Sequence, residues 1–407
     1  MAARDFTDEH APAGATPAWA EWRPTADGSE YTLGVEEELM MLHPEDWSLA
    51  HRIDSVRPKL SAALAERVST ETHGSALELA TGVHHDVGGA VRELAGLRAN
   101  LEVELETMGL RAASAGTHPF AVWQDIVISR GERQEAVYGS MRELARREPT
   151  FALHVHVGVR GPNTAVALVN RMRGHLPLLL ALSVNSPFWQ GRDTGLASAR
   201  TPLFQAFPRV GIPRAFESYD AYVEAVDLVI RCEGFPDPSF LWWDVRPVPR
   251  FGTVEVRIMD AQTTVDETAS IVALVQSVAR LEAEEGYHTS PLLDSPEILI
   301  ENRFLAARDG MEGSLIDAQR ERRLPALELL DRLLDACRPH AEDLGCTAEL
   351  DGVRALGAAT GSQRQLAVAR AKTGLDGLVG ELARAFSGSE AGAMTRLGAV
   401  RPRPGAP

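Results

Sequence analysis

The chain has 407 residues and a formal net charge of −16, and its apolar (44%) and charged (24%) fractions are those of an ordinary soluble globular protein. The acidic balance argues against nucleic-acid or anionic-membrane partners, because both need clustered basic charge. No apolar run approaches the roughly 20 residues that span a bilayer, and the N-terminus lacks a signal-peptide pattern, so we expect a cytoplasmic protein.

Both ends of the chain are poor in residues that form a core. Residues 1–29 and 387–407 have no hydrophobic periodicity, so we expect two mobile tails around a single domain of residues 30–386. Helical patterns within this domain are predicted at 88–113, 130–147, 163–183, 217–232, 264–285 and much of 314–386.

The first strand pattern, YTLGVEEELM at 31–40, contains three adjacent carboxylates. In an extended strand Glu36 and Glu38 share one face, about 7 Å apart, and they repel each other unless a cation or arginines neutralise them. Alternating acids on a strand are more often a solvated face paired with arginines, and the segment alone leaves both interpretations open. Glu37 points to the apolar face, so we expect it to be structural, with an arginine as the candidate partner.

Two further strand patterns show the same division into an apolar and a polar face. In 75–81, leucines oppose Glu78, and in FALHVHVGV at 151–159, five apolar residues oppose His154 and His156. A lone histidine is more often packed or at the surface. Two histidines on one face of a strand that is apolar on the other are equally consistent with metal ligands.

The pattern at 253–260 places Thr253, Glu255, Arg257 and Met259 opposite three branched apolar residues. Glu255 and Arg257 could form a cross-strand ion pair or belong to a site. An antiparallel sheet with helices on its apolar side explains all four strands, which predicts the α+β class.

The polar faces of these strands would then line one basin. Its residues would be Glu36, Glu38, Glu78, His154, His156, Glu255 and Arg257. Carboxylate oxygens suit Mg²⁺ or Mn²⁺, and Mg²⁺ is often held by a few carboxylates together with nucleotide phosphates. We therefore expect the carboxylates to hold cations.

Other phosphate and metal motifs fit less well. An HxH pair also occurs in amidohydrolases, but only His175, His288 and His340 follow it, and no lysine between 59 and 372 is present to form a bridging carbamate. A metal-dependent amide hydrolase is therefore an alternative with less support. Neither GxxxxGK[ST] nor GxGxxG occurs, so the P-loop and dinucleotide-binding motifs are lacking.

A set of segments resembles a known family in content and order. They are GVEEE (34–38), ELAT (78–81), GTHPFAVW (116–123), HVHVG (154–158), SVNSPFW (183–189), SARTPLFQAFPRVGIP (198–213), LWWDVRP (241–247), TVEVRIMD (253–260) and ENRFLAARDG (301–310). Over about residues 30–380 the chain resembles the YbdK-type carboxylate-amine ligases of the glutamate-cysteine ligase type 2 family. The resemblance implies a glutamine-synthetase-like fold, with an antiparallel sheet curved around an ATP and divalent-metal site, and makes 30–386 a catalytic domain with a helical C-terminal part.

The chemistry that this resemblance implies is ATP-dependent amide formation with Mg²⁺ (or Mn²⁺). A substrate carboxylate attacks ATP and becomes an acyl phosphate, and an amine then displaces phosphate. The shared motifs concern phosphate and metal, so they leave the carboxylate, with glutamate as one candidate, and the amine open. A noncatalytic nucleotide- or metabolite-binding protein on the same scaffold is a further alternative. Free sheet edges are compatible with a homodimer.

The resemblance also implies roles for single residues. The metal ligands would be Glu36, Glu38, Glu78, Glu255 and His154. Arg257 would face the transferred phosphoryl group, and Arg200 the acyl phosphate or the substrate carboxylate. The nucleotide or substrate contacts would be His154, His156, Arg246, Arg303 and Arg308. His118 would either close the site or cap a turn.

Overall fold

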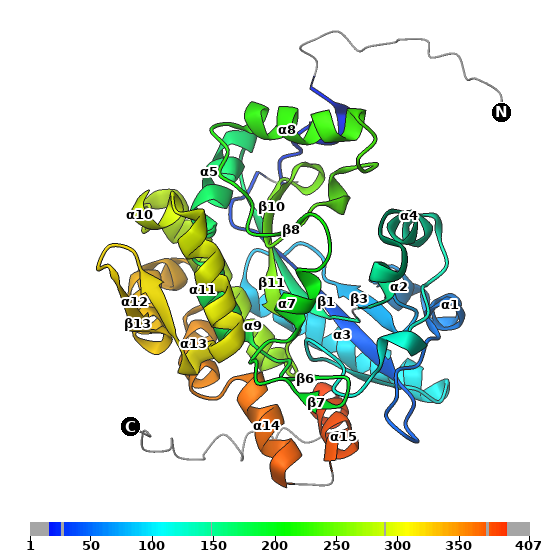
Figure 1. Cartoon of the computed structure of the whole chain (residues 1–407). Coiled ribbons are helices and arrows are strands. Elements are labelled where there is room, and N and C mark those ends of the chain that lie inside the picture. The colour runs from blue at the N-terminus through cyan, green and yellow to red at the C-terminus, as the bar shows by residue number, and fades with distance from the viewer. Residues whose placement is uncertain (1–15, 26–27, 148, 289, 372–373, 389–407) are drawn as a thin grey trace, which may run out of the picture.

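A seven-stranded antiparallel sheet forms the centre of the residues that the computed structural model describes, which are 16–25, 28–147, 149–288, 290–371 and 374–388 (Figure 1). Its strands are β1 (Leu33–Leu42), β2 (Val68–Thr70), β3 (Ala76–Ala80), β4 (Arg111–Ala113), β5 (Ala152–Gly158), β10 (Val245–Val248) and β11 (Thr253–Asp260). Their order is β10-β11-β5-β1-β3-β2, and β4 pairs with the end of β1. The four strands predicted from alternation are β1, β3, β5 and β11, and they are consecutive neighbours in the sheet.

Helices and short strand pairs surround this sheet. The helices are α1 (Ile53–Val56), α2 (Ala62–Ala65), α3 (Val87–Thr107), α4 (Glu132–Met141), α5 (Pro162–Met172), α6 (Leu176–Ser183), α7 (Arg200–Phe204), α8 (Tyr219–Arg231), α9 (Val265–Glu284), α10 (Ser290–Leu293), α11 (Pro296–Asp309), α12 (Ala326–Leu344), α13 (Thr347–Ala358), α14 (Gly361–Ala371) and α15 (Gly374–Phe386). The short pairs are β6 (Phe188–Trp189) with β7 (Arg192–Asp193), β8 (Val210–Gly211) with β9 (Trp242–Trp243), and β12 (Ser314–Asp317) with β13 (Arg322–Pro325). In Figure 1, α8 lies at the top of the molecule and α14 and α15 lie at the bottom.

The apolar face of the sheet packs against α3, α5, α6 and α9. Val35, Val155 and Val256 stand side by side in the register of β1, β5 and β11, and all three are buried in one hydrophobic cluster with side chains from these helices. Helix α9 starts at a capping box in which Thr264 and Glu267 satisfy each other's backbone N–H groups. The helices thus bury one side of the strands, and the opposite side remains for polar side chains.

Three predicted helices differ from the structure. The helix predicted at 88–113 ends at Thr107, because the chain turns at Gly109 (φ +71°) and then pairs with β1 as β4. The helix predicted at 163–183 is two helices, α5 and α6, separated at residues 173–175. The segment from 314 begins with the β12–β13 hairpin before its helices start.

The predicted alternation in 253–260 was wrong at its end. The register of β11 against β5 shifts between Val256 and Met259, which is a β-bulge or a similar irregularity. Met259 consequently lies in the same hydrophobic cluster as Val256 and Ile258, and not on the polar face. Arg257 lies at the shift, where its N–H donates to Asp244 O (2.8 Å).

The predicted N-terminal tail is partly folded. Residues 1–15, like residues 389–407 of the predicted C-terminal tail, lie outside the described residues. Ala20 is buried, the Trp22 ring packs edge-on against Tyr219 of α8, and Trp19 Nε1 donates to Asp227 of the same helix (3.0 Å). Residues 16–25 therefore belong to the folded body.

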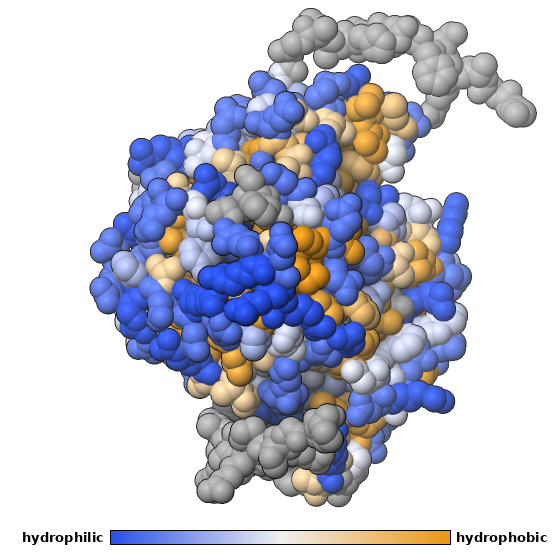
Figure 2. All heavy atoms as spheres, turned by 60° about the vertical axis from the view of Figure 1, so that its left-hand side comes forward, coloured by the Kyte–Doolittle hydropathy of each residue, from blue (hydrophilic) through white to orange (hydrophobic). Residues whose placement is uncertain are grey.

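Hydrophilic side chains cover much of the face shown in Figure 2, with apolar side chains in patches between them. Within the described chain, no helix combines the length and the apolar run that a membrane crossing requires.

Candidate active site

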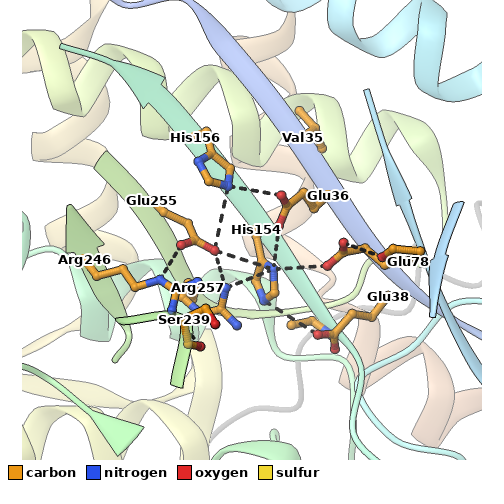
Figure 3. A network of polar contacts seen from close by, with 12 residues as sticks. Val35, Glu36, Glu38, Glu78, His154, His156, Ser239, Arg246, Glu255 and Arg257 are labelled. Atoms are coloured by element: carbon orange, nitrogen blue, oxygen red, sulfur yellow. Dashed lines mark hydrogen bonds and ion pairs between the residues drawn. The ribbon is translucent and has the colours of Figure 1, made fainter. Parts of the chain in front are cut away.

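A cavity of about 640 Å³ lies over the polar face of the sheet. All seven residues predicted for the basin line it, and so do Arg200 and Arg246. Side chains from β1, β3, β5 and β11 point toward one another there (Figure 3). The structure thus brings most of the predicted site residues together.

The strand register explains this convergence. Glu36 stands opposite His154, His156 stands opposite Glu255, and Glu38 stands opposite Glu78. Because directly opposed residues point to the same face, the alternation within each strand becomes a continuous polar row across the sheet.

Glu36 lies between the two histidines. Its carboxylate is 3.2 Å from His154 Nδ1 and 3.3 Å from His156 Nε2. Burial opposes ionisation of Glu36, but the two imidazoles outweigh burial and hold its pKa well below the usual range. His156 has a raised pKa because Glu36 and Glu255 outweigh the effect of burial. The strand pair thus keeps Glu36 as a carboxylate.

Glu255 is fully buried between two arginines. Arg246 Nε donates to Glu255 Oε2 (2.6 Å), and Arg257 Nη1 donates to Glu255 Oε1. Burial would raise the pKa of Glu255, but both guanidinium groups hold it well below the usual range. Glu255 and Arg257 do form an ion pair, but within β11, and the cross-strand partner of Glu255 is Arg246 of β10; both pairs lie inside the cavity.

Two other carboxylates have the opposite behaviour. Burial, followed by repulsion from neighbouring carboxylates, raises the pKa of Glu78 well above its ordinary value. For the same reasons the pKa of Glu71 is raised to about 8, with Glu38 as the main repelling charge. Carboxyl groups with raised pKa values next to ionised ones mark a position where positive charge is lacking.

The donor atoms fit divalent cations. Three groups have ligand atoms within 4.8 Å of one another: Glu36, Glu78 and His154; Glu36, His156 and Glu255; and Glu38, Glu71 and Glu78. His156 Nε2 is buried at ion-pair distance from Glu36 (3.3 Å) and Glu255 (3.8 Å). Oxygen-rich sets of this kind suit Mg²⁺ or Mn²⁺, so the residues present match the predicted metal.

Arg200 reaches the cavity from α7 and is held from behind. Its Nη1 donates to Ile258 O (3.0 Å) and lies 3.7 Å from Asp260, whose carboxylate also accepts from Ser186 and Ser198. Its Nε is buried without a hydrogen-bond partner among the described residues. Arg200 therefore lines the cavity as a guanidinium group that Asp260 and backbone oxygens hold in place.

Three predicted residues lie elsewhere. Arg303 is buried in a bidentate pair with Asp244, at 2.6 and 3.2 Å, so it supports the cavity wall from outside. Arg308 pairs with Asp309 at another surface depression. His118 accepts from the N–H groups of Phe120 and Ala121, so it caps a turn.

The histidines that could complete a hydrolase site also lie elsewhere. His175 and His288 line a different cavity, and His340 pairs with Glu285. None of these three histidines joins the HxH pair, so they do not supply the further ligands that the hydrolase alternative needs.

Several cavity residues were not predicted. Glu71 and Arg57 lie before β3 in the sequence, and Arg133 belongs to α4. Trp242 belongs to β9, and Asp244 lies between β9 and β10. These residues come from loops, helix ends and a strand of two residues, where no alternation reveals which way a side chain points. Trp242 and Asp244 lie in the segment LWWDVRP, whose family match was the one available signal.

A second cavity of about 680 Å³ adjoins the first, and Glu36, His156 and Arg250 line both. Most of its other lining residues are apolar or small. Phe251 borders it half-exposed, with its ring centroid 5.8 Å from that of His156 and the Arg250 guanidinium 4.4 Å from its own centroid. The polar basin thus adjoins a cavity with a less polar lining.

Comparisons with proteins of known sequence agree on one protein family. The family model "Glutamate-cysteine ligase family 2" matches residues 32–384. A relative from Rubrobacter xylanophilus, provisionally named glutamate–cysteine ligase 2-1, is 41% identical over 344 residues, which are 83% of this chain and 90% of the relative. A relative from Sorangium cellulosum, provisionally named glutamate–cysteine ligase 2, is 39% identical over 349 residues, 84% of this chain and 93% of the relative.

Solved structures show the same fold. The glutamate–cysteine ligase of Francisella tularensis in complex with AMP has a TM-score of 0.65 at 14% identity, covering 91% of this chain and 92% of that chain. A bifunctional glutathione synthetase from Pasteurella multocida has a TM-score of 0.65 at 13% identity, covering 88% of this chain and 52% of that one. The predicted fold class is confirmed.

Proposed function

The chain belongs to glutamate–cysteine ligase family 2 and is a ligase, and we propose that it joins a small-molecule carboxylate to an amine with the use of ATP and Mg²⁺ (or Mn²⁺). One observation carries the proposal. Glu36, Glu78 and Glu255 converge with His154 and Arg257 in one cavity, although they come from separate strands.

The proposed reaction has two steps. An oxygen of the substrate carboxylate attacks the γ-phosphorus of ATP, the bond to ADP breaks, and an acyl phosphate forms. The amine nitrogen then attacks the acyl carbon, phosphate leaves with the electrons of the C–O bond, and the nitrogen loses a proton to solvent. Both steps need positioned reactants and positive charge around phosphoryl oxygens.

The arginines supply part of that charge. Arg257 and Arg200 both line the cavity, so their guanidinium groups bring positive charge to the place where a phosphoryl group would lie. We assign Arg257 to the transferred phosphoryl group and Arg200 to the acyl phosphate or the substrate carboxylate.

The cations would be held by Glu36, Glu38, Glu78, Glu255 and His154, joined by Glu71. Mg²⁺ supplies Lewis-acid stabilisation of phosphoryl oxygens when it is bound. The repulsion among these carboxylates, which raises the pKa values of Glu71 and Glu78, gives the site its affinity for cations.

The second cavity offers a place for the nucleotide base. Its apolar lining and the half-exposed Phe251 suit an adenine ring. Because Glu36 and His156 line both cavities, the phosphates of a nucleotide bound there would extend directly into the basin. We therefore assign His156 and Arg246 to the phosphate side. The Francisella neighbour was solved with AMP, which fits an adenine nucleotide.

The carboxylate substrate we propose is an amino acid of the glutamate type. Arg57, Arg133 and Arg250 line the first cavity besides the arginines near Glu255, so more than one substrate carboxylate can find a cation. The relatives' names refer to glutamate and cysteine. A cytoplasmic location and a homodimer through a sheet edge stay predictions.

The test is release of phosphate from ATP in the presence of Mg²⁺, with and without pooled amino acids and amines. We expect release that depends on an added carboxylate and is lost in Glu36→Gln. Release from ATP that continues unchanged in Glu36→Gln would remove the site assignment. Binding of ATP and Mg²⁺ without any turnover would favour the noncatalytic alternative, and amide hydrolysis without ATP would favour the hydrolase.

A further inference from the structure

A second cluster of metal-ligating side chains lies outside the ligase cavity. His175 directly precedes α6, Glu282 belongs to the last turns of α9, and His288 lies in the loop that follows α9. His175 and His288 line a separate cavity of about 270 Å³, which shares no lining residue with the basin. The proposed ligation reaction does not use this cluster.

The three side chains are already close together. His175 Nε2 lies 2.5 Å from Glu282 Oε1, and the His175 and His288 ring centroids are 4.1 Å apart. One donor atom from each residue lies within 4.8 Å of those of the other two. His175 and Glu282 are fully buried, whereas His288 is half-buried at the cavity.

The local backbone is built for this approach. A Cβ at Gly174 would lie 2.5 Å from Cδ2 of His288, so only glycine lets that imidazole pack beside His175. Gly286 has φ +69°, and a side chain there would also collide with the Arg171 guanidinium. The N–H of His288 donates to Glu282 Oε1 (3.1 Å), which fixes the loop against α9.

One carboxylate oxygen of the cluster is buried without a hydrogen bond from the described residues to compensate for its burial. Glu282 Oε2 is buried and makes no hydrogen bond within the described chain. The nearest cation, Arg171 Nη1, is 3.8 Å away and donates to the backbone oxygen of Glu282. An unpaired carboxylate oxygen in the interior is costly, so this arrangement calls for a further positive group.

We propose that His175, Glu282 and His288 bind one Zn²⁺ ion, with a water molecule in the fourth position facing the cavity. Two imidazoles and one carboxylate form a donor set that zinc uses when it keeps an open position. Imidazole nitrogen favours zinc over Mg²⁺, which separates this site from the oxygen-rich basin.

The rearrangement needed is small. Ligand distances of about 2.0–2.2 Å place neighbouring ligand atoms roughly 3.3 Å apart, so His175 and Glu282 must separate by roughly 1 Å. His175 would then carry its proton on Nδ1, which frees Nε2 for the ion. The bound ion would connect α6, α9 and the loop after α9, so it should stabilise this part of the fold.

The test is Zn²⁺ titration of the chelator-treated full chain by calorimetry, with excess Mg²⁺ present to compete at the basin. Wild type and Glu36→Gln are expected to bind one equivalent with similar affinity. His288→Ala, which changes the half-buried ligand, is expected to bind at least about tenfold more weakly. His43→Ala, a histidine outside both clusters, is the matched control and should behave as wild type.

Four further readouts separate loss of the site from loss of the fold. Co²⁺ should give visible absorption of a nitrogen–oxygen site in wild type and Glu36→Gln and not in His288→Ala. Zn²⁺ should raise the melting temperature of wild type and of Glu36→Gln but not of His288→Ala, while circular dichroism and Mg²⁺-dependent turnover of His288→Ala stay unchanged. Wild-type zinc binding by His288→Ala, or loss of binding confined to Glu36→Gln, would overturn the proposal.

Discussion

Glu38 of β1 and Glu78 of β3 stand directly opposite each other on the polar face of the sheet. Like charges in that position destabilise an antiparallel pair. Ser69 donates to Glu78 Oε1 (2.9 Å) and the N–H of Ala152 donates to Glu38 Oε2 (2.7 Å), but neither partner carries a charge. The fold therefore keeps a repulsive pair at the centre of its candidate active site, as a cation-binding site requires.

The substitution Glu78→Gln should make the metal-free protein more stable, by about 1 kcal/mol at pH 8. The pKa of Glu78 is raised in the fold, so the folded state loses stability as pH rises from the unfolded value of 4.5 toward the folded one, and glutamine removes that loss. Urea unfolding without metal measures the change. Mg²⁺ should raise the melting temperature of wild type more than that of Glu78→Gln. An exposed-site control, Glu45→Gln, should match wild type in both measurements, and a destabilised metal-free Glu78→Gln would contradict the repulsion argument.

Replacement of Arg257 by lysine keeps the charge but removes the planar group that reaches Glu255 and the proposed phosphoryl position together. We expect kcat to fall about 100-fold, with a much smaller change in the KM for ATP, because the lost contact acts mainly on the transition state. Steady-state kinetics with saturating Mg²⁺ will check this. Arg308→Lys, at an exposed arginine outside the cavity, should retain wild-type rates. Equal effects of both substitutions would reject the role of Arg257.

Phe251→Ala tests the proposed position of the base. Loss of a stacking surface should raise the KM for ATP about 5- to 100-fold and leave kcat within about twofold. Substrate-saturation curves for ATP and for the carboxylate distinguish the nucleotide from the other substrate. Phe304→Ala removes a similarly exposed ring on α11 and serves as the control. An effect on the carboxylate KM alone would place the base elsewhere.

The strands and most of the basin could be predicted because side chains alternate between the two faces of a strand, and this alternation is visible in a short stretch of sequence. Glu36, His154 and Glu255 were found in this way, and their opposition across strands then followed from antiparallel pairing. Glu37 was predicted to be structural with an arginine partner, and Arg98 fills that role.

Other features depend on contacts that are distant in the sequence. The register shift that moves Met259 into the core has no local signal, and Glu71 comes from a segment without alternation. Arg303 and Arg308 belong to a family-like segment on α11, but a motif does not tell which face of a helix meets the cavity. Loop and helix-face positions therefore required the structure.

The buried pair of Glu37 and Arg98 makes a stability prediction. Arg98 Nε and Nη2 each donate to the Glu37 carboxylate at 2.8 Å, and Thr268 Oγ1 donates to it at 2.6 Å. Arg98→Met leaves the carboxylate buried without a cation, so we expect a loss of about 3–5 kcal/mol in the free energy of unfolding. Urea denaturation measures it. The double variant Glu37→Leu and Arg98→Met should recover most of the loss, and additive losses would show that the pair itself contributes little.

His118 caps a turn, and its buried imidazole makes the free energy of unfolding depend on pH. Its imidazole is buried, accepts two backbone N–H groups and contacts Trp47 O at 2.8 Å, and burial lowers its pKa from 6.5 to about 4. Between these values the unfolded chain binds one proton more than the folded chain, so acidification costs about 1.4 kcal/mol per pH unit. His118→Gln removes that proton, and we expect unfolding free energies measured at pH 7, 6 and 5 to fall less steeply than in wild type by this amount. His73, whose pKa burial also lowers to about 4, provides the matched variant His73→Gln, and the double variant should flatten the dependence by two protons. If the unfolding free energies of wild type and His118→Gln depend on pH in the same way, His118 takes up its proton in the folded state. That result would contradict the argument that the contacts in the turn keep the imidazole neutral.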